Sequence, residues 1–345
     1  MSNYASPETI QLYTDRFSEQ ISHVDPCTFR QLPDFTQHIN HTGRPTVIDF
    51  EPEQTVLIDY EAAGIDTSTI ITGLKFGLKP GNRIGREDSH RVVLQGDIYV
   101  MNESSDTGVT KEVAVKPGYE NRGSLRDSLG EVAMFQYMGQ LDLPTLKSFA
   151  IHVEDTGMNH IITSYRSDVK TLDSVEWKKL TPEDMWEQVK IAINGIALMH
   201  SNLLVHNDFY FKNVGFDDTG MPVIVDPESM TSVRELPELL HGAEPRSMDQ
   251  TEKRVFDGLV RLLNKDFSDL STSIQKYVLP QIYNKKKMPD SKKKFKLYKK
   301  HLYVPYGIAL EQNLESINSP HRAILSAAFD SMVSLNKDWA IEGVL

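Results

Sequence analysis

The chain has 345 residues, a formal net charge of −11 at pH 7, 39% hydrophobic residues and 25% charged residues. This composition is typical of a globular protein, and the acidic balance does not suggest general nucleic-acid binding. The single cysteine, Cys27, excludes a disulfide within the chain and favours a reducing compartment. We find no signal peptide and no apolar stretch of about 18 residues, so we expect a cytoplasmic protein with no membrane partner.

One segment departs from the acidic balance. Residues 285–300 contain nine lysines and one aspartate, a charge of +8, which leaves −19 for the rest of the chain. A block of this kind is usually a solvated face or a mobile loop. A docking surface for a phosphorylated or acidic partner is the alternative. The sequence alone does not decide between these roles.

The first part of the chain is polar and then rich in strand patterns. Residues 1–68 contain several prolines, and we interpret them as a partly helical N-terminal extension without an assigned function. Between 69 and 168, apolar and β-branched runs predict strands, and the apolar spacing over 124–141 predicts a helix. The polar stretch 102–110 is expected to be a hairpin loop. The predicted strands are 69–78, 91–101, 111–117, 145–155 and 159–167.

The sequence pattern changes from strand-like to helical near residue 181. Thr181 is a good helix N-cap and Pro182 suits the first helical position, so a long buried helix is expected to begin there. From about 249 onward the patterns are nearly all helical. The region 169–345 is therefore read as a helical lobe with a C-terminal helical extension. Strands followed by helices predict an α+β protein, with a small antiparallel-sheet lobe before the helical lobe.

Lys116 and Glu131 form the first candidate pair. Lys116 ends an apolar strand, and a buried ammonium group needs an anionic partner. Glu131 lies beside the apolar face of the helix that follows, so it is the leading candidate for that partner. A surface lysine and an ordinary exposed glutamate are the alternative reading.

A second set of polar residues interrupts the apolar stretch "LMHSNLLVHNDFYFKNVGF". Asp208 and Asn213 are five residues apart, a spacing that can direct a carboxylate at a hydroxyl and an amide oxygen at a metal ion. Asp226 follows thirteen residues later, where we expect it to end a buried strand just before a proline. Phosphoryl transfer requires an oriented nucleophile and Mg²⁺, which is commonly held by one or two carboxylates together with phosphate oxygens.

In this order, the residues resemble the protein-kinase-like superfamily over roughly residues 70–265. "VAVK" at 113–116 is similar to the strand that carries the phosphate-binding lysine, and Glu131 is similar in position to that lysine's partner. "HNDFYFKN" at 206–213 resembles the catalytic loop. "VDPES" at 225–229 stands where protein kinases have Asp-Phe-Gly.

The resemblance implies a bilobal kinase-like fold and a phosphotransferase that uses ATP and Mg²⁺ as cofactors. By position, Asp208 would be the catalytic base, and Asn213 and Asp226 would bind Mg²⁺. Lys116 would contact the ATP phosphates, and Glu131 would orient Lys116.

Several departures from protein kinases favour the small-molecule branch. Asn207 replaces the arginine that usually precedes the catalytic aspartate, and Pro227 and Glu228 replace Phe-Gly. The glycine-rich loop is degenerate, with 73–85 or the lone Gly96 as candidates for contacting the cofactor. The pattern is most similar to aminoglycoside, choline and ketosamine kinases.

Two further residues receive roles from the resemblance. Lys212 lies where tyrosine kinases carry an arginine that neutralises the γ-phosphate, which makes it a candidate catalytic residue; a surface lysine is the alternative. His206 would be structural and would brace the loop.

Three functions are compatible with these residues. The first is a kinase that phosphorylates a hydroxyl of a small molecule, and the complete set of expected residues favours it. The second is an atypical protein Ser/Thr kinase similar to the RIO type, in which the basic run 285–300 would dock a protein. The third is a non-enzymatic pseudokinase. The sequence identifies neither the acceptor nor the oligomeric state.

Overall fold

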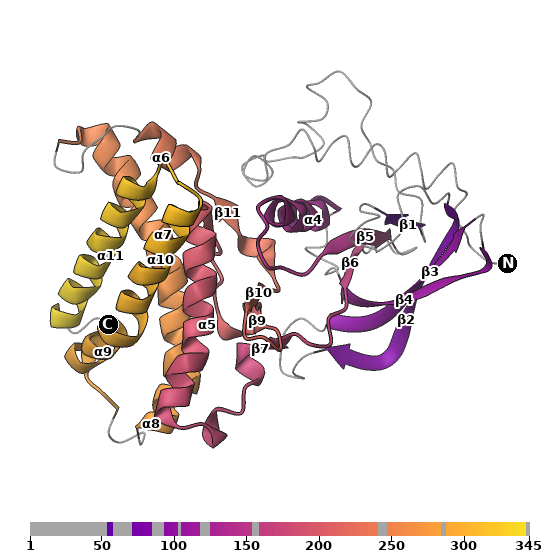
Figure 1. Cartoon of the computed structure of the whole chain (residues 1–345), viewed down its shortest axis with the longest axis horizontal. Coiled ribbons are helices and arrows are strands. Elements are labelled where there is room, and N and C mark those ends of the chain that lie inside the picture. Colours follow the sequence, from indigo (N-terminus) through magenta and orange to yellow (C-terminus); the bar gives the residue numbers. More distant parts are fainter. Residues whose placement is uncertain are drawn as a thin grey trace. The chain divides into compact units, whose positions relative to one another are not determined.

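The computed structural model describes residues 54–57, 71–84, 93–102, 105–117, 125–153, 159–240, 247–283 and 288–342 (Figure 1). The chain divides into two compact units, Met1–Ser167 and Asp168–Leu345. Helices are combined with small antiparallel sheets, which confirms the predicted α+β class. The helix expected near the start of the chain lies outside the described residues.

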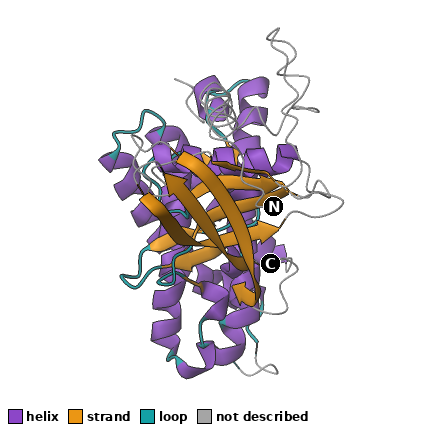
Figure 2. Ribbon diagram, turned by 90° about the vertical axis from the view of Figure 1, so that its right-hand side faces the viewer, coloured by secondary structure: helices purple, strands orange, loops and turns teal. Residues whose placement is uncertain are grey.

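The first unit contains a six-stranded sheet in the order β1-β5-β6-β4-β3-β2, in which every neighbouring pair is antiparallel. Figure 2 draws the strands as orange arrows, and its longest ones belong to this sheet. Strands β2, β3 and β4 follow one another as a meander. The strands are β1 (Gln54–Leu57), β2 (Ile71–Ile84), β3 (Val93–Asn102), β4 (Ser105–Pro117), β5 (Ser148–Val153) and β6 (Asn159–Ser164).

Strand β4 begins earlier than the sequence predicts. The hairpin loop expected at 102–110 is wrong for most of its length, because β4 starts at Ser105 and Thr110 pairs with Tyr99 of β3. Polar turn-forming residues are accepted here because pairing with a neighbouring strand satisfies their backbone groups.

Helix α4 (Leu125–Gln140) packs against β5 and β6. Its buried residues Val132, Phe135 and Met138 recur every three positions, which places them on one face of the helix. The buried side chains Val113 and Val115 of β4 belong to the core of the same unit. Burial of these side chains fixes the end of β4 and the middle of α4, which carry the charged pair described below.

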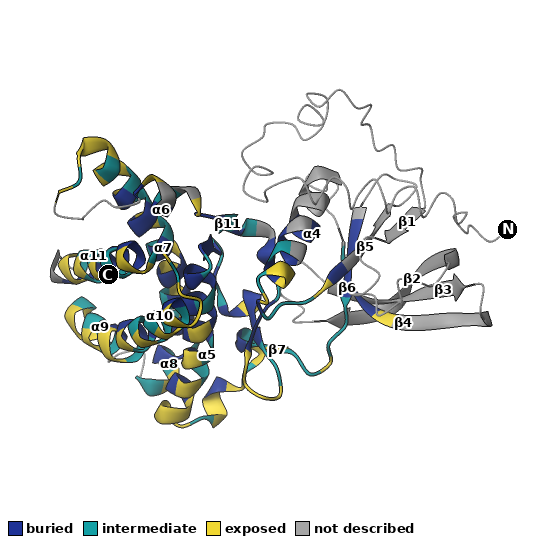
Figure 3. Ribbon diagram, turned by 45° about the horizontal axis from the view of Figure 1, so that its top comes forward, coloured by how far each residue is buried: buried dark blue, intermediate teal, exposed yellow. Residues whose placement is uncertain are grey.

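The second unit is mainly helical. Helix α5 packs against α10, and α7 packs against α11; Figure 3 shows their buried residues in dark blue. None of the described helices has a segment long and apolar enough to cross a membrane. The helices are α5 (Pro182–Ser201), α6 (Glu235–Leu239), α7 (Gln250–Tyr277), α8 (Leu279–Ile282), α9 (Ser291–Tyr298), α10 (Val304–Ser316) and α11 (Arg322–Glu342).

The start of α5 follows the sequence prediction. The Thr181 side chain accepts a hydrogen bond from the backbone amide of Asp184, and Pro182 is the first helical residue. Since proline lacks an N–H group, it costs nothing at a position where that group would have no partner.

Two small antiparallel sheets of this unit frame the candidate site. In the first, β9 (Val214–Phe216) lies between β7 (Lys170–Thr171) and β10 (Pro222–Ile224). In the second, β8 (Leu204–Val205) pairs with β11 (Thr231–Ser232). The chain between β8 and β9 contains residues 206–213, so both ends of that segment are anchored in sheets.

The basic run is largely helical where the structure describes it. Residues 288–300 include all of α9, and the Asp290 side chain caps this helix by accepting a hydrogen bond from the Lys293 amide. The interpretation as a mobile loop is therefore wrong for α9. Residues 284–287 lie outside the described residues.

Candidate functional site

Residues 206–213, the centre of the predicted catalytic loop, follow β8 and end with the short 3₁₀ helix η3 (Phe211–Asn213). Leu203, just before β8, and Asn207 have φ angles of 59° and 64°. These are left-handed conformations that are unfavourable for most side chains, although asparagine tolerates them better than most. The surrounding contacts must therefore hold this backbone in place.

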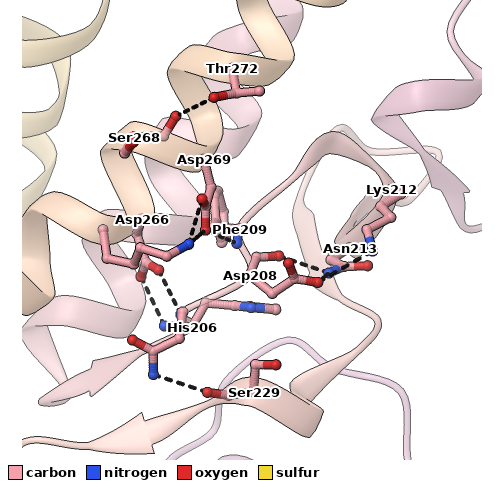
Figure 4. Close-up of polar contacts among 12 residues, drawn as sticks. His206, Asp208, Phe209, Lys212, Asn213, Ser229, Asp266, Ser268, Asp269 and Thr272 are labelled. Atoms are coloured by element: carbon pink, nitrogen blue, oxygen red, sulfur yellow. Dashed lines mark hydrogen bonds and ion pairs between the residues drawn. The ribbon is translucent and has the colours of Figure 1, made fainter.

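Helix α7 provides those contacts through side chains that accept hydrogen bonds from loop amides (Figure 4). Asp266 accepts from the amides of His206 and Asn207, both at 2.8 Å. Asp269 accepts from the Phe209 amide at 3.2 Å.

A third acceptor on the same helix completes the set. Ser273 Oγ accepts from the amide of Phe211 at 3.1 Å. Asp266, Asp269 and Ser273 are three and four residues apart, so they share one face of α7. Four loop amides are thereby satisfied by one helix, which fixes the path of the backbone around Asp208.

Asp266 also joins a buried polar chain. His200 Nε2 lies 3.1 Å from Asp266 Oδ2, and His200 Nδ1 lies 2.8 Å from the Tyr306 hydroxyl. A His200 that donates from Nε2 and accepts at Nδ1 satisfies all three groups. Burial, followed by the negative charge of Asp266, raises the pKa of Tyr306, so the phenol stays protonated and can donate.

Sequence reasoning missed these supporting residues. Asp266, Asp269 and Ser273 lie about 60 positions beyond their partners, so no local pattern connects the two segments. A signal was present in the helix itself. The two aspartates occur on the apolar side of α7, beside the buried residues Phe267 and Leu270, where an unpartnered carboxylate would be costly.

Asp208, Lys212 and Asn213 lie together, as Figure 4 shows. The Asn213 amide nitrogen donates to the backbone oxygen and to Oδ2 of Asp208, both at 2.7 Å. Lys212 Nζ lies 3.3 Å from Asp208 Oδ2, and these side chains are 53% and 32% exposed. Because Asn213 uses its nitrogen for both bonds, its amide oxygen is left as an acceptor.

Asp226 is kept close to Asn213 by backbone pairing between β9 and β10. Ile224, the last residue of β10, pairs with Val214, and the Val225 amide donates to the Asn213 carbonyl at 3.3 Å. Asp226 is the next residue and is partly exposed. It therefore lies two residues beyond the strand rather than ending it, and it is kept near Asn213 by sheet pairing.

Asn207 connects the two segments. Its side-chain nitrogen donates to the Ser229 carbonyl at 3.0 Å and to Thr231 Oγ1 at 3.1 Å. A neutral amide thus bonds the predicted catalytic loop to the chain that follows Asp226. Sequence reasoning identified Asn207 as a departure from protein kinases but did not foresee this contact.

His206 is fully buried, and neither of its ring nitrogens has a hydrogen-bond partner among the described residues. The ring packs edge-to-face on Phe209, with 5.5 Å between centroids. Burial lowers the pKa of His206, against opposing effects of the carboxylates of Asp266, Asp226 and Asp208. A buried ring that stays neutral fits the structural role expected for this residue.

In the first unit, Lys116 and Glu131 form an ion pair. Lys116 Nζ lies 2.8 Å from both carboxylate oxygens of Glu131, and the side chains are 15% and 5% exposed. The pair joins the end of β4 to α4. The contact expected from the sequence is present, and the role of the pair in phosphate binding stays a prediction.

Gly96 does not lie in a loop. It is inside β3, where it pairs with Leu78 on one side and Val113 on the other. In the alternative candidate segment, 73–85, most residues belong to β2, with a register shift between Leu78 and Arg83. Gly96 therefore belongs to the strand ladder, inside the strand predicted at 91–101, and its contact with the cofactor stays a prediction.

In comparisons with known proteins, no family model and no curated protein matches this chain. Among the described residues, no group of three or more histidine, cysteine, aspartate or glutamate side chains is arranged to hold a metal ion. A cation at Asp226 and Asn213 would therefore need further oxygen ligands from a bound molecule.

Proposed function

We propose that the chain is a bilobal, kinase-like phosphotransferase that transfers the γ-phosphate of Mg-ATP to a hydroxyl of a small molecule. The ion pair of Lys116 and Glu131 carries the proposal. It joins the third strand of the β2–β3–β4 meander to the helix that follows, as the lysine and glutamate of protein kinases do.

The residues present fit a magnesium ion. Asn213 offers an amide oxygen because its nitrogen is bound to Asp208, and Asp226 offers a carboxylate that sheet pairing keeps near it. Mg²⁺ is usually held by one or two carboxylates together with phosphate oxygens and water. When bound, the ion would neutralise charge on the nucleotide phosphates.

Asp208 is the group that orients and deprotonates the acceptor. Its Oδ2 is held by Asn213 and Lys212, while its side chain is partly exposed. A carboxylate fixed through one oxygen can accept the acceptor's proton on the other. The acceptor oxygen then forms a bond to the γ-phosphorus, the bond between that phosphorus and the β–γ bridging oxygen breaks, and ADP leaves.

Two lysines supply positive charge in this scheme. Lys116, oriented by Glu131, contacts the α- and β-phosphates. Lys212 is half exposed and lies beside Asp208, so it can contact the γ-phosphate as its negative charge redistributes during transfer.

The contacts of Asn207 favour a small acceptor. In protein kinases an arginine at this position pairs with a phosphorylated activation loop. Here Asn207 bonds directly to Ser229 and Thr231, so no phosphate is needed to hold the following segment in place.

A substrate screen coupled to ADP production tests the proposal. Wild-type protein should turn over ATP with a hydroxyl-bearing small molecule and Mg²⁺. Asp208→Asn keeps the shape of the side chain but removes the base, so turnover should fall by at least about a hundredfold. The exposed residue Asp218 provides the matched control, since Asp218→Asn should leave turnover unchanged.

Circular dichroism must show that both variants remain folded. Undiminished turnover in Asp208→Asn would contradict the proposal. A screen with labelled ATP, separated into metabolite and protein fractions, identifies the acceptor class. Label that enters protein alone would replace the small-molecule acceptor by a protein.

A further inference from the structure

The helical rod formed by α9, the π-helical turn η6 (Lys299–Tyr303) and α10 has an unusual charge distribution. Residues 291–310 contain six lysines and neither aspartate nor glutamate. The whole chain, in contrast, has a net charge of −11. Residues 291–310 therefore present a local positive field on an otherwise acidic protein, while the last part of α10 carries Glu311 and Glu315.

Five residues of the rod form a stripe, which we call the lysine–aliphatic stripe: Lys292, Lys296, Lys300, Val304 and Ile308. Each is four residues from the next, so consecutive members are neighbours about one turn apart and the row winds gradually around the helix. All five are exposed, including Val304 at 50% and Ile308 at 55%. In Figure 3, exposed residues of α9 and α10 are coloured yellow.

The lysines of the stripe are available for an external partner. Within the described residues, Lys292, Lys296 and Lys300 form no ion pair and no side-chain hydrogen bond. Their neighbour Lys293 has a long ion pair of 3.8 Å with Asp290, and both of these side chains are well exposed. Since an exposed ion pair is weak, it does not neutralise the positive face.

Three of the aromatic residues of the rod are buried, and Phe295 and His301 are partly exposed. Tyr298, Tyr303 and Tyr306 are buried, and His301 stacks on Trp186 with 4.4 Å between ring centroids. No aromatic side chain of the described rod is in the exposed class. The surface therefore lacks the stacking platforms by which proteins bind single-stranded nucleic acid.

The type of basic residue in the rod also indicates what kind of partner it binds. The rod contains lysine but no arginine between 291 and 310. Arginine is preferred where a phosphate is recognised through paired hydrogen bonds, whereas lysine acts as a hydrated point charge. A row of lysines suits an array of anions whose positions are not fixed.

We propose that the lysine–aliphatic stripe binds the surface of a membrane that contains anionic phospholipid. Lysines near such a surface are attracted by its negative potential, and exposed aliphatic side chains can enter the boundary between headgroups and acyl chains. The electrostatic attraction comes from Lys292, Lys296 and Lys300, and the apolar contact comes from Val304 and Ile308. This binding is peripheral, and it revises the expectation from sequence of no membrane partner.

The acidic remainder of the chain determines which face of the protein can approach the membrane. A protein of net charge −11 is repelled as a whole by an anionic membrane, so only a face with local positive charge can approach it. At physiological ionic strength, charges act over about 8 Å, so the lysines of the stripe outweigh more distant carboxylates. The inference does not rest on the proposed kinase activity.

Vesicle co-sedimentation of the full chain tests the proposal. Wild-type protein should sediment with phosphatidylcholine vesicles that contain phosphatidylserine and stay in solution with phosphatidylcholine alone. The triple change Lys292→Gln, Lys296→Gln and Lys300→Gln should weaken binding by about tenfold to a hundredfold. Added salt should weaken wild-type binding as well.

A matched control removes the same charge elsewhere. Lys178, Lys253 and Lys337 are exposed and lie outside the rod, so their joint replacement by glutamine should leave binding nearly unchanged. The pair Val304→Ser and Ile308→Ser keeps the charge and should weaken binding several-fold through lost apolar contact.

Three results would overturn the proposal. The first is equal sedimentation with both kinds of vesicle. The second is a triple variant that binds like wild type, or a control variant that loses as much. The third is stripe-dependent binding to RNA or polyglutamate without binding to the anionic vesicles, which would assign the surface to another class of partner.

Discussion

The 206–213 segment and the Lys116–Glu131 pair, which carry the two halves of the proposed chemistry, are held in place differently. In the segment, four backbone amides donate hydrogen bonds to side chains of α7. In the pair, two charged side chains from β4 and α4 meet directly. The first arrangement fixes a backbone, and the second fixes two side chains.

This difference has a consequence for substitution. A backbone held through its amides keeps its path when a side chain that it carries is replaced, so Asp208 and Lys212 can be changed without moving the loop. In the ion pair, removal of either side chain leaves the other charge buried without this partner. The tryptophans separate the two cases experimentally, because Trp177, Trp186 and Trp339 all lie in the second unit.

The largest effect is expected from Asp266→Ala. The change leaves the amides of His206 and Asn207 and the ring of His200 without their acceptor, and His200 and His206 are fully buried. We expect a loss of about 3 to 5 kcal/mol in the free energy of unfolding. Urea denaturation followed by tryptophan fluorescence measures it. Asp257→Ala, an exposed change on the same helix, should cost less than about 0.5 kcal/mol.

The next effect tests the ion pair. Lys116→Met leaves Glu131 buried without this lysine and should lower the free energy of unfolding by about 3 kcal/mol. Circular dichroism measures this loss, because the tryptophans lie in the other unit. The double change Lys116→Met and Glu131→Met should cost less than the sum of the single changes. Additive costs would show that the two charges do not interact. Lys147→Met, an exposed change in the same unit, is the control.

A smaller effect is expected from Gly215→Ala, in β9 just after Asn213. A methyl group there would lie 2.8 Å from Val169 Cγ1 and 3.1 Å from Val225 Cγ1, so these side chains must shift. The cost should be about 1 to 3 kcal/mol in tryptophan-detected unfolding. Gly258→Ala in α7 meets nothing within 4 Å and should stabilise the protein by up to about 1 kcal/mol.

The fourth prediction concerns pH. Burial lowers the pKa of His206 in the folded protein below its ordinary value of 6.5. The unfolded chain therefore binds this proton first as the pH falls, and stability declines below pH 6.5. His206→Leu should remove that part of the decline. Unfolding curves of the two proteins at several pH values measure the difference, and parallel curves would contradict the prediction.

The smallest effect on stability is expected from Lys212→Met. The ion pair of Lys212 with Asp208 is half exposed, so its loss should cost less than about 1 kcal/mol. Turnover in the proposed reaction should nevertheless fall, because positive charge beside the γ-phosphate is lost. A large loss of stability without loss of turnover would assign Lys212 a structural role.

Local signals made several elements predictable from the sequence. Thr181 and Pro182 mark the start of α5, and the apolar spacing around Glu131 places α4 within a residue at each end. In both cases the information lies within one helical turn or one repeat. The contact of Lys116 with Glu131 could also be foreseen, because a short connection separates the strand from the helix.

Contacts between distant segments could not be predicted in this way. The burial of Asp266 and Asp269 depends on a loop about 60 positions earlier, and no local signal connects the two segments. The extension of β4 to Ser105 has the same origin, since pairing with β3 outweighs a polar composition. In each case a long-range partner overrides the local preference.

The amide bonds to α7 have a consequence for the dynamics of the loop. An amide that donates to a buried carboxylate can exchange its hydrogen with solvent only when that bond opens. The amides of His206 and Asn207 both donate to Asp266, which lies in the middle of a 28-residue helix. The 206–213 segment is thereby coupled to the cooperative opening of α7, although loops are commonly among the first parts of a protein to open.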